Sequence, residues 1–187
     1  MKPMETLEYI RKHLHRFSEF AAVLSVCSLM VVSVYVAVDV VSRKALGISF
    51  FGTDELAGYA FAIVVGWGGC YSFMSGGMIR VDVIYVLLPG VGRAWLDVLA
   101  ALATFLVATV LAYNAVELSL ESLEFNNVSN TPLRLPLWMP QAAWSVGFYA
   151  LAASSLLMTV ETFLLALAGR HQDVIEITKS NGREVAT

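Results

Sequence analysis

The chain has 187 residues, of which 58% are hydrophobic and 14% are charged, and its mean hydropathy is +0.70. This balance lies outside the range of soluble globular domains and indicates an integral membrane protein. The net charge of -3 is too small to indicate a nucleic-acid partner. We expect one membrane domain over residues 1–187.

Four long apolar stretches follow one another along the chain. A helix that rises about 1.5 Å per residue needs about 20 residues to cover a hydrocarbon core of roughly 30 Å. The sequence predicts membrane-spanning helices over residues 18–41, 54–77, 96–118 and 137–165. The fold class that follows is an all-α integral membrane protein with four transmembrane helices and short interfacial amphipathic helices.

The segment before the first span is basic and amphipathic. Apolar residues recur at positions 7, 10, 14 and 17, on one helical face, and other positions carry Arg11, Lys12 and Arg16. Such a helix can lie in the headgroup region with its basic side toward anionic lipid, or it can extend the first span. The first span is too long for a signal-peptide core of roughly 7–15 residues, so we expect it to be retained.

The remaining connections also carry residues typical of a membrane interface. A short apolar segment at about 81–89 cannot cross the bilayer, and it is flanked by Arg80, Asp82, Arg93 and Trp95. We expect an interfacial helix there. Pro136 and Pro140 precede the fourth span, with Trp138 and Trp144 at headgroup level. The polar residues 172–187 are predicted to form a flexible tail.

The distribution of basic residues predicts the orientation in the membrane. Nine of the 12 Lys and Arg residues lie in the N-terminal segment, the second connection and the tail. The other three, Arg43, Lys44 and Arg134, lie in the first and third connections. Because basic loops stay in the cytoplasm, both termini are predicted to be cytoplasmic.

Small residues recur at every fourth position in two spans. The second span carries Gly58, Ala62, Gly66 and Cys70. The third carries Ala100, Thr104, Ala108 and Ala112. Small residues let helix backbones approach closely in lipid, so these stripes predict packing against each other or against a partner chain. The alternative is chance, because Gly and Ala are common in membrane helices.

The spans contain no charged residue at mid-bilayer, where ion and proton paths place them. Asn114 and Gln141 are the deepest strongly polar residues, and such residues more often form interhelical hydrogen bonds than ligand sites. The three histidines lie outside the spans, which argues against haem. The sequence indicates no catalytic, cofactor or metal site, and we expect neither an enzyme nor a cofactor.

Residues 54–82 resemble a known family. Asp54-Glu55 opens the second span, Trp67-Gly68-Gly69 follows, and the segment ends in Gly77-Met78-Ile79-Arg80-Val81-Asp82. This pattern is similar to the small membrane subunit (DctQ-like) of tripartite ATP-independent periplasmic (TRAP) transporters. Pro136, Trp138 and Gly147-Phe148 fit the resemblance as well. Gly58 and Met78 depart from it, because the family commonly has a basic residue and His there.

The resemblance implies a sodium-coupled secondary transporter of three parts in the bacterial inner membrane. A large membrane subunit would carry the substrate and sodium sites, and a periplasmic binding protein would deliver a carboxylate or dicarboxylate. The small subunit would brace the large one, with Glu55 and Asp82 either solvated at the interface or contacting a partner. Contacts with the binding protein would involve Asp54, Glu117 and Gln141.

Two other functions remain open from the sequence. One is a membrane anchor subunit of a respiratory enzyme with a quinone site. The other is a self-contained small transporter or channel.

Overall fold

The computed structural model describes residues 3–50, 52–77, 85 and 87–180. Within these ranges the chain forms the helices α1 (Pro3–Leu46), α2 (Thr53–Met74), α4 (Gly90–Glu124), α5 (Trp138–Leu167) and α6 (His171–Ser180). The helices α1, α2, α4 and α5 are long and apolar enough to cross a membrane. This confirms the predicted all-α fold with four membrane helices.

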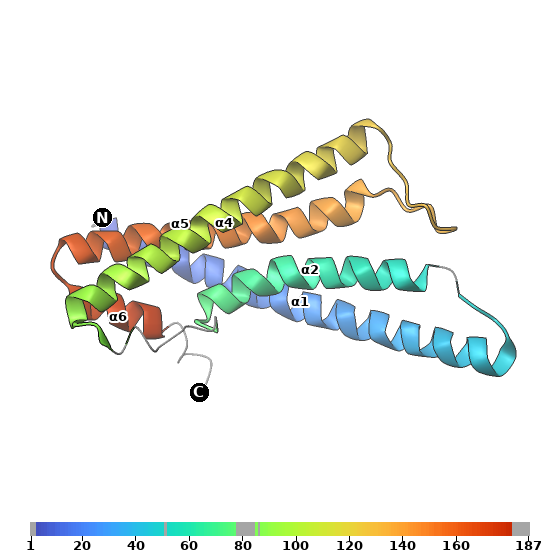
Figure 1. The fold of residues 1–187 in the computed structure, drawn as a ribbon, viewed down its shortest axis with the longest axis horizontal. Coiled ribbons are helices and arrows are strands. Elements are labelled where there is room, and N and C mark those ends of the chain that lie inside the picture. Colours follow the sequence, from blue (N-terminus) through green and yellow to red (C-terminus); the bar gives the residue numbers. More distant parts are fainter. Residues whose placement is uncertain (1–2, 51, 78–84, 86, 181–187) are drawn as a thin grey trace.

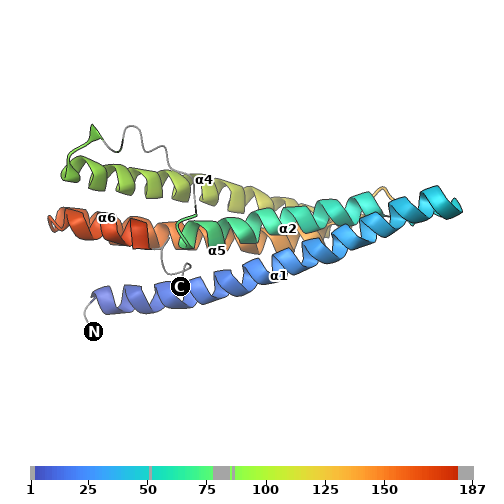
Figure 2. The same cartoon turned by 90° about the horizontal axis from the view of Figure 1, so that it is seen from below.

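The four long helices form a row rather than a closed bundle (Figures 1 and 2). Helix α1 packs along α2, α2 packs against α5, and α5 packs against α4. The start of α1 and helix α6 lie at one end, which we call the terminal end. The opposite end carries the connections 47–52 and 125–137, and we call it the loop end. Helix α5 is thus the central element that joins the two helical hairpins.

Helix α1 runs without a break for 44 residues, or about 66 Å at 1.5 Å per residue. Leu14 packs against the buried cluster that includes Cys70 and Met74 near the end of α2. The first part of α1 therefore projects past α2, as Figure 2 shows. Of the two interpretations of the basic segment, the structure supports the extension of the first span, because Arg11 and Lys12 lie on the same continuous helix.

The membrane helices differ from the predicted spans at their ends. Helix α2 stops at Met74 rather than at residue 77, because Gly76 adopts a left-handed φ of 66° and Gly77 N–H donates to Ser72 O at 2.8 Å. Helix α5 begins at Trp138, between Pro136 and Pro140. The predicted interfacial helix at 81–89 falls largely outside the described residues, as do Arg80 and Asp82.

The predicted flexible tail is wrong for residues 172–180, which lie in α6. Gly169 adopts a φ of 73°, after which the chain turns and α6 packs on α4 and α5. Val174 is 0% exposed and belongs to a cluster with Ala94, Val98, Leu165 and Ala166. The Thr178 hydroxyl donates to Asp97 Oδ2 at 3.1 Å. Ile177 packs against the same cluster, so residues 174, 177 and 178 form an inward face at helical spacing that the sequence analysis missed.

Replacing Val174 with Asp is expected to detach α6 from the membrane helices. The new carboxylate would be buried in an apolar cluster, where an unpaired charge is strongly unfavourable. Trypsin cleavage after Arg170 should therefore become at least about tenfold faster in detergent. Gln172→Asp, which adds the same charge at an exposed position of α6, is the control and should leave the rate unchanged. Equal rates for the two variants would show that α6 is not anchored through Val174.

Candidate helix-packing and partner-binding site

Helices α2 and α5 approach each other most closely where two glycines meet. A Cβ atom built on Gly147 would lie 2.4 Å from Trp67 Cδ1 and 2.5 Å from the carbonyl carbon of Gly66. A Cβ on Gly66 would lie 2.9 Å from Trp144 O. Since real Cβ atoms do not approach this closely, only glycine fits at either position. The Trp67 indole N–H also donates to Ala143 O at 2.6 Å and joins the helices by a hydrogen bond.

The predicted stripe on α2 is only partly buried. Gly66 and Cys70 face α5, and Cys70 Sγ lies 3.6 Å from Ser154 Oγ. Gly58 is exposed, and a Cβ there would meet nothing within 4 Å. Gly68, which the resemblance singled out, is near only Val64 of its own helix. The half-buried Ala62 lines a surface groove between α2 and α4.

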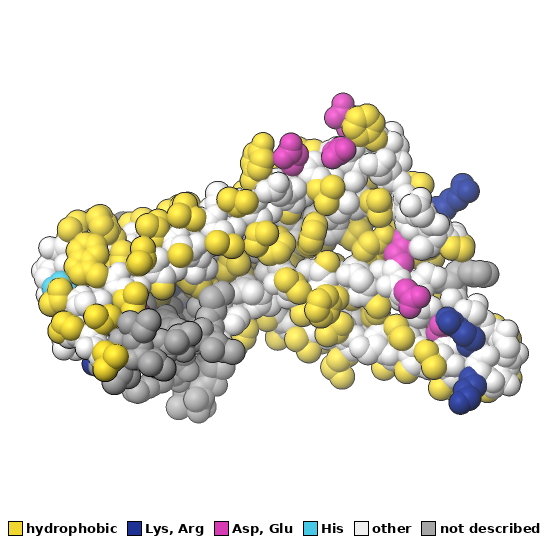
Figure 3. All heavy atoms as spheres, viewed as in Figure 1, with side chains coloured by type: hydrophobic (Ala, Val, Ile, Leu, Met, Phe, Trp, Pro, Cys, Tyr) yellow, Lys and Arg dark blue, Asp and Glu magenta, His cyan; other side chains and the backbone are white. Residues whose placement is uncertain are grey.

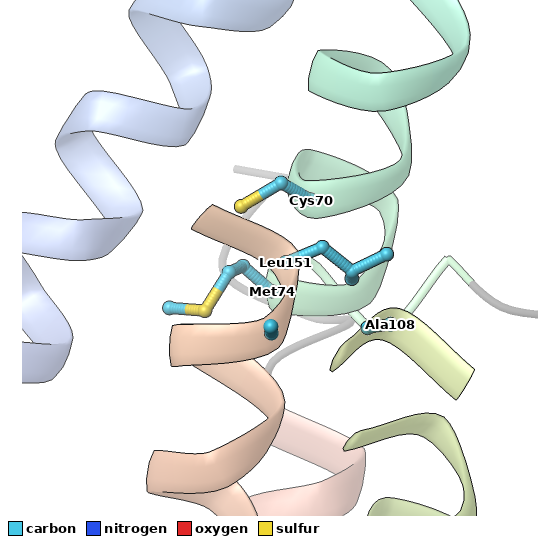
Figure 4. Close-up of a cluster of buried hydrophobic side chains, with 5 residues drawn as sticks. Cys70, Met74, Ala108 and Leu151 are labelled. Carbon is cyan, nitrogen blue, oxygen red and sulfur yellow. The ribbon is translucent and has the colours of Figure 1, made fainter. Parts of the chain in front are cut away.

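Between the glycine contact and the terminal end, three helices meet in a small apolar cluster. Figure 4 shows Cys70 and Met74 of α2, Leu151 of α5 and Ala108 of α4 drawn together. These four side chains are at most 8% exposed. The cluster fixes the position of α4 relative to α2 although the two helices are separated by α5 along the row.

Helix α4 packs against α5 through a face of small side chains. The buried residues of this face are Ala94, Asp97, Val98, Ala101, Ala108, Ala112, Ala115, Ser119 and Ser122. Ala108 and Ala112 of the predicted stripe are each 1% exposed, whereas Ala100 is exposed and Thr104 is half-buried. Within the chain the stripe is thus buried at two of its four positions, because a strict spacing of four drifts by about 40° per step around a helix of 3.6 residues per turn. Whether Ala100 and Thr104 pack against a partner chain stays a prediction.

At the loop end, Glu55 is the centre of a hydrogen-bonded network. Its carboxylate accepts hydrogen bonds from the hydroxyls of Tyr59 and Thr131. Thr131 also lies 2.8 Å from Ser129 Oγ. Because Ser129 and Thr131 belong to the connection between α4 and α5, Glu55 ties that connection to α2. Glu55 therefore has partners within its own chain.

A second carboxylate holds the connection between α1 and α2. Asp39 is buried, accepts a hydrogen bond from Phe50 N–H at 2.6 Å, and pairs with Arg43 at 2.6 Å. Gly52 adopts a φ of 78°, and Leu133 of the other connection packs within 3.1 Å of its Cβ position. Sequence reasoning missed this role of Asp39, for which the only signal is a charged residue at the end of an apolar run.

The predicted contacts with a binding protein lie in different environments. Asp54 and Glu117 are exposed, and the charged side chains visible in Figure 3 gather toward the loop end. Gln141 instead faces α4. With its amide group turned so that both the nitrogen and the oxygen have hydrogen-bond partners, the nitrogen donates to Ser122 Oγ at 2.7 Å. Gln141 thus forms the interhelical contact expected of a polar residue at this depth.

The interfacial residues predicted from the sequence lie near both ends of the row. Trp95 is exposed at the terminal end and stacks edge-on against Phe163, with ring centroids 6.1 Å apart. The Arg93 side chain donates to Leu88 O at 2.8 Å. Trp138 and Trp144 are half-buried at the start of α5. Lys12 and Arg16 are exposed and Arg11 is half-exposed on the projecting part of α1.

The described part of the chain contains no group of three or more His, Cys, Asp or Glu residues that could hold a metal ion. Its buried acidic side chains, Asp39, Asp97 and Glu161, all lie within two turns of a helix end. The arrangement is a set of packing faces with polar contacts at both ends.

Comparison with known proteins agrees with this arrangement. Residues 30–165 match the family model described as "Tripartite ATP-independent periplasmic transporters, DctQ component". No curated protein and no solved structure matches the chain. The family match covers most of the sequence and includes all of α2, α4 and the glycine contact with α5. The chain therefore belongs to the DctQ family, the small membrane subunits of TRAP transporters, and it is a transporter component rather than an enzyme.

Proposed function

We propose that this chain is the scaffold subunit of a sodium-coupled TRAP transporter that imports an organic anion of the carboxylate or dicarboxylate type. It would act with a large membrane subunit and a periplasmic binding protein in the bacterial inner membrane. The observation that carries the proposal is the contrast between tight helix packing and the position of the buried charges. Within the described residues, the buried acidic side chains all lie near helix ends. An ion or substrate pathway would instead be expected to place charged side chains near the middle of the membrane.

The packing supports a bracing role. The glycine contact and the Trp67 hydrogen bond join α2 to α5, and the small-residue face joins α5 to α4. A row of helices joined by these contacts would present a long, rigid surface to a large subunit that moves during transport. The large subunit would supply the substrate and sodium sites.

The proposed orientation places both termini in the cytoplasm, because nine of the 12 Lys and Arg residues belong in sequence to the N-terminal segment, the second connection and the tail. The loop end then faces the periplasm. The exposed carboxylates of Asp54 and Glu117 would be available there to the binding protein. Glu55 and Gln141 would act on that contact indirectly, because both have partners inside the chain.

Uptake in proteoliposomes tests the proposed function. We expect substrate accumulation under an inward sodium gradient only when this chain, the large subunit and the binding protein are all present. The probes are a radiolabelled four-carbon dicarboxylate and a set of monocarboxylates. Omitting this chain should reduce uptake to background. Accumulation with this chain alone would overturn the scaffold function and indicate a self-contained transporter, and full uptake without it would overturn its requirement.

A further inference from the structure

A small hollow toward the loop end lies where three helices meet. It has a volume of about 190 Å³ and is lined by Tyr59 and Ala62 of α2, by Leu118 of α4 and by residues at the start of α5. Leu118 is 42% exposed, so the hollow is open to the surface of the row. Small-molecule sites usually measure about 300–1,000 Å³, so this hollow suits a narrow apolar group better than a compact substrate. We call it the loop-end hollow.

Three side chains of the lining carry polar atoms, and two of them have partners within the chain. The Tyr59 hydroxyl donates to the Glu55 carboxylate, and the Gln141 amide bonds Ser122 Oγ. The third is Trp144, whose Nε1 is buried and whose N–H has no acceptor among the residues that the structure describes. A buried donor without an acceptor is unfavourable, so an acceptor from outside the chain would stabilise this site.

The depth of Trp144 suits an acceptor that belongs to a lipid. Helix α5 has 30 residues and is about 45 Å long, which is the thickness of a bilayer with its headgroup regions. With α5 centred in the bilayer, the hydrocarbon core begins about 7.5 Å from the end of the helix. Trp144 lies about 9 Å from the start of α5 at Trp138. Its ring is therefore at the boundary where ester carbonyls join the acyl chains of a phospholipid to glycerol.

Other small occupants fit the loop-end hollow less well. A buried water typically needs two to four polar partners, whereas the indole of Trp144 offers a single donor in a mostly apolar lining. A carboxylate substrate would need a cationic partner, and the lining contains no Lys or Arg. An ester carbonyl needs only one donor, and its acyl chain can cover the apolar side chains of Leu118 and Pro140.

We propose that the loop-end hollow binds one acyl chain of a phospholipid, and that the ester carbonyl of this chain accepts a hydrogen bond from Trp144 Nε1. Because neighbouring side chains cover Nε1, the half-buried indole turns toward the hollow when the lipid binds. The bound chain lies against Ala62 and Leu118. The site belongs to this chain alone and needs no partner subunit, so the inference goes beyond the proposed function.

Lipid binding by the purified full-length chain, measured by native mass spectrometry from a mild detergent, tests the site. The probes are two phosphatidylethanolamines of equal chain length, a diester and a diether that lacks both carbonyls. The parent should bind the diester about fivefold more tightly, as expected for one net hydrogen bond. Trp144→Phe keeps an aromatic ring, removes the N–H and should lose this preference. Trp95→Phe, the same substitution at an exposed position of the terminal end, is the control and should keep it.

A second pair of variants tests whether the acyl chain occupies the hollow. Ala62→Leu fills part of the hollow and should weaken the binding of both lipids at least threefold. Ala153→Leu adds the same side chain at an exposed position of α5 and should bind both lipids as the parent does.

Three outcomes would overturn the inference. Equal binding of the diester and the diether by the parent would show that no ester carbonyl is bound. A preference that persists in Trp144→Phe would place the carbonyl at another donor. Equal lipid binding by Ala62→Leu and Ala153→Leu would place the acyl chain outside the hollow. The comparison of the two lipids on the parent needs no variant, so it decides whether a carbonyl is bound even if a variant fails to fold.

Discussion

Gly147→Ala is expected to lower the thermal midpoint of the purified chain in detergent by about 5–10 °C. The added methyl group would lie 2.4 Å from Trp67 Cδ1 and 2.5 Å from a backbone atom of Gly66, so α2 and α5 must move apart. Forced overpacking of this kind typically destabilises a fold by about 1–3 kcal/mol, and each kcal/mol lowers the midpoint by about 2–4 °C at this chain length. Gly147→Leu should prevent recovery of a monodisperse protein.

The chain contains suitable controls for this substitution. Gly58→Ala adds the same methyl group at an exposed position of α2 where nothing lies within 4 Å. It should leave the midpoint unchanged or raise it slightly, because alanine favours helix more than glycine does. Gly66→Ala, which would bring a methyl group within 2.9 Å of Trp144 O, should fall between the two. Equal midpoints for Gly147→Ala and Gly58→Ala would show that the helices are further apart than the structure places them.

Glu55→Ala is expected to release the connection between α4 and α5. The substitution removes the acceptor of the Thr131 and Tyr59 hydroxyls, and hydrogen bonds to a charged group each contribute about 1.5–3 kcal/mol. Local opening of the connection should become roughly tenfold or more frequent. Amide hydrogen exchange of residues 128–135 reports that opening directly.

Two further variants define the role of Glu55. Glu117→Ala removes an exposed carboxylate from α4 and should leave exchange in this connection unchanged. Glu55→Gln retains one carbonyl acceptor and should give an intermediate rate. If Glu55→Ala exchanges no faster than Glu117→Ala, Glu55 does not hold the connection, and its contribution would have to lie in contact with a partner.

Much of the fold was predictable because the bilayer imposes simple rules on the sequence. Long uncharged runs identified the four membrane helices, and the segment from Asp54 to Asp82 indicated the family. Small residues at Gly66, Ala108 and Ala112 indicated packing faces that the structure shows buried. The stripes nevertheless included Gly58 and Ala100, which are exposed, since residue type alone does not say which side of a helix meets a neighbour.

Hydropathy and motif spacing are local properties, so they were enough to predict four membrane-crossing helices and the transporter family. The contact between Gly66 and Gly147, the hydrogen bond from Trp67 to the backbone of α5 and the hydrogen bond from Thr131 to Glu55 emerge only when the helices are packed together. These contacts join residues 76 or more positions apart, where no local pattern links the partners. The docking of α6 through Val174 has the same cause, because its burial depends on a surface formed by α4 and α5 together.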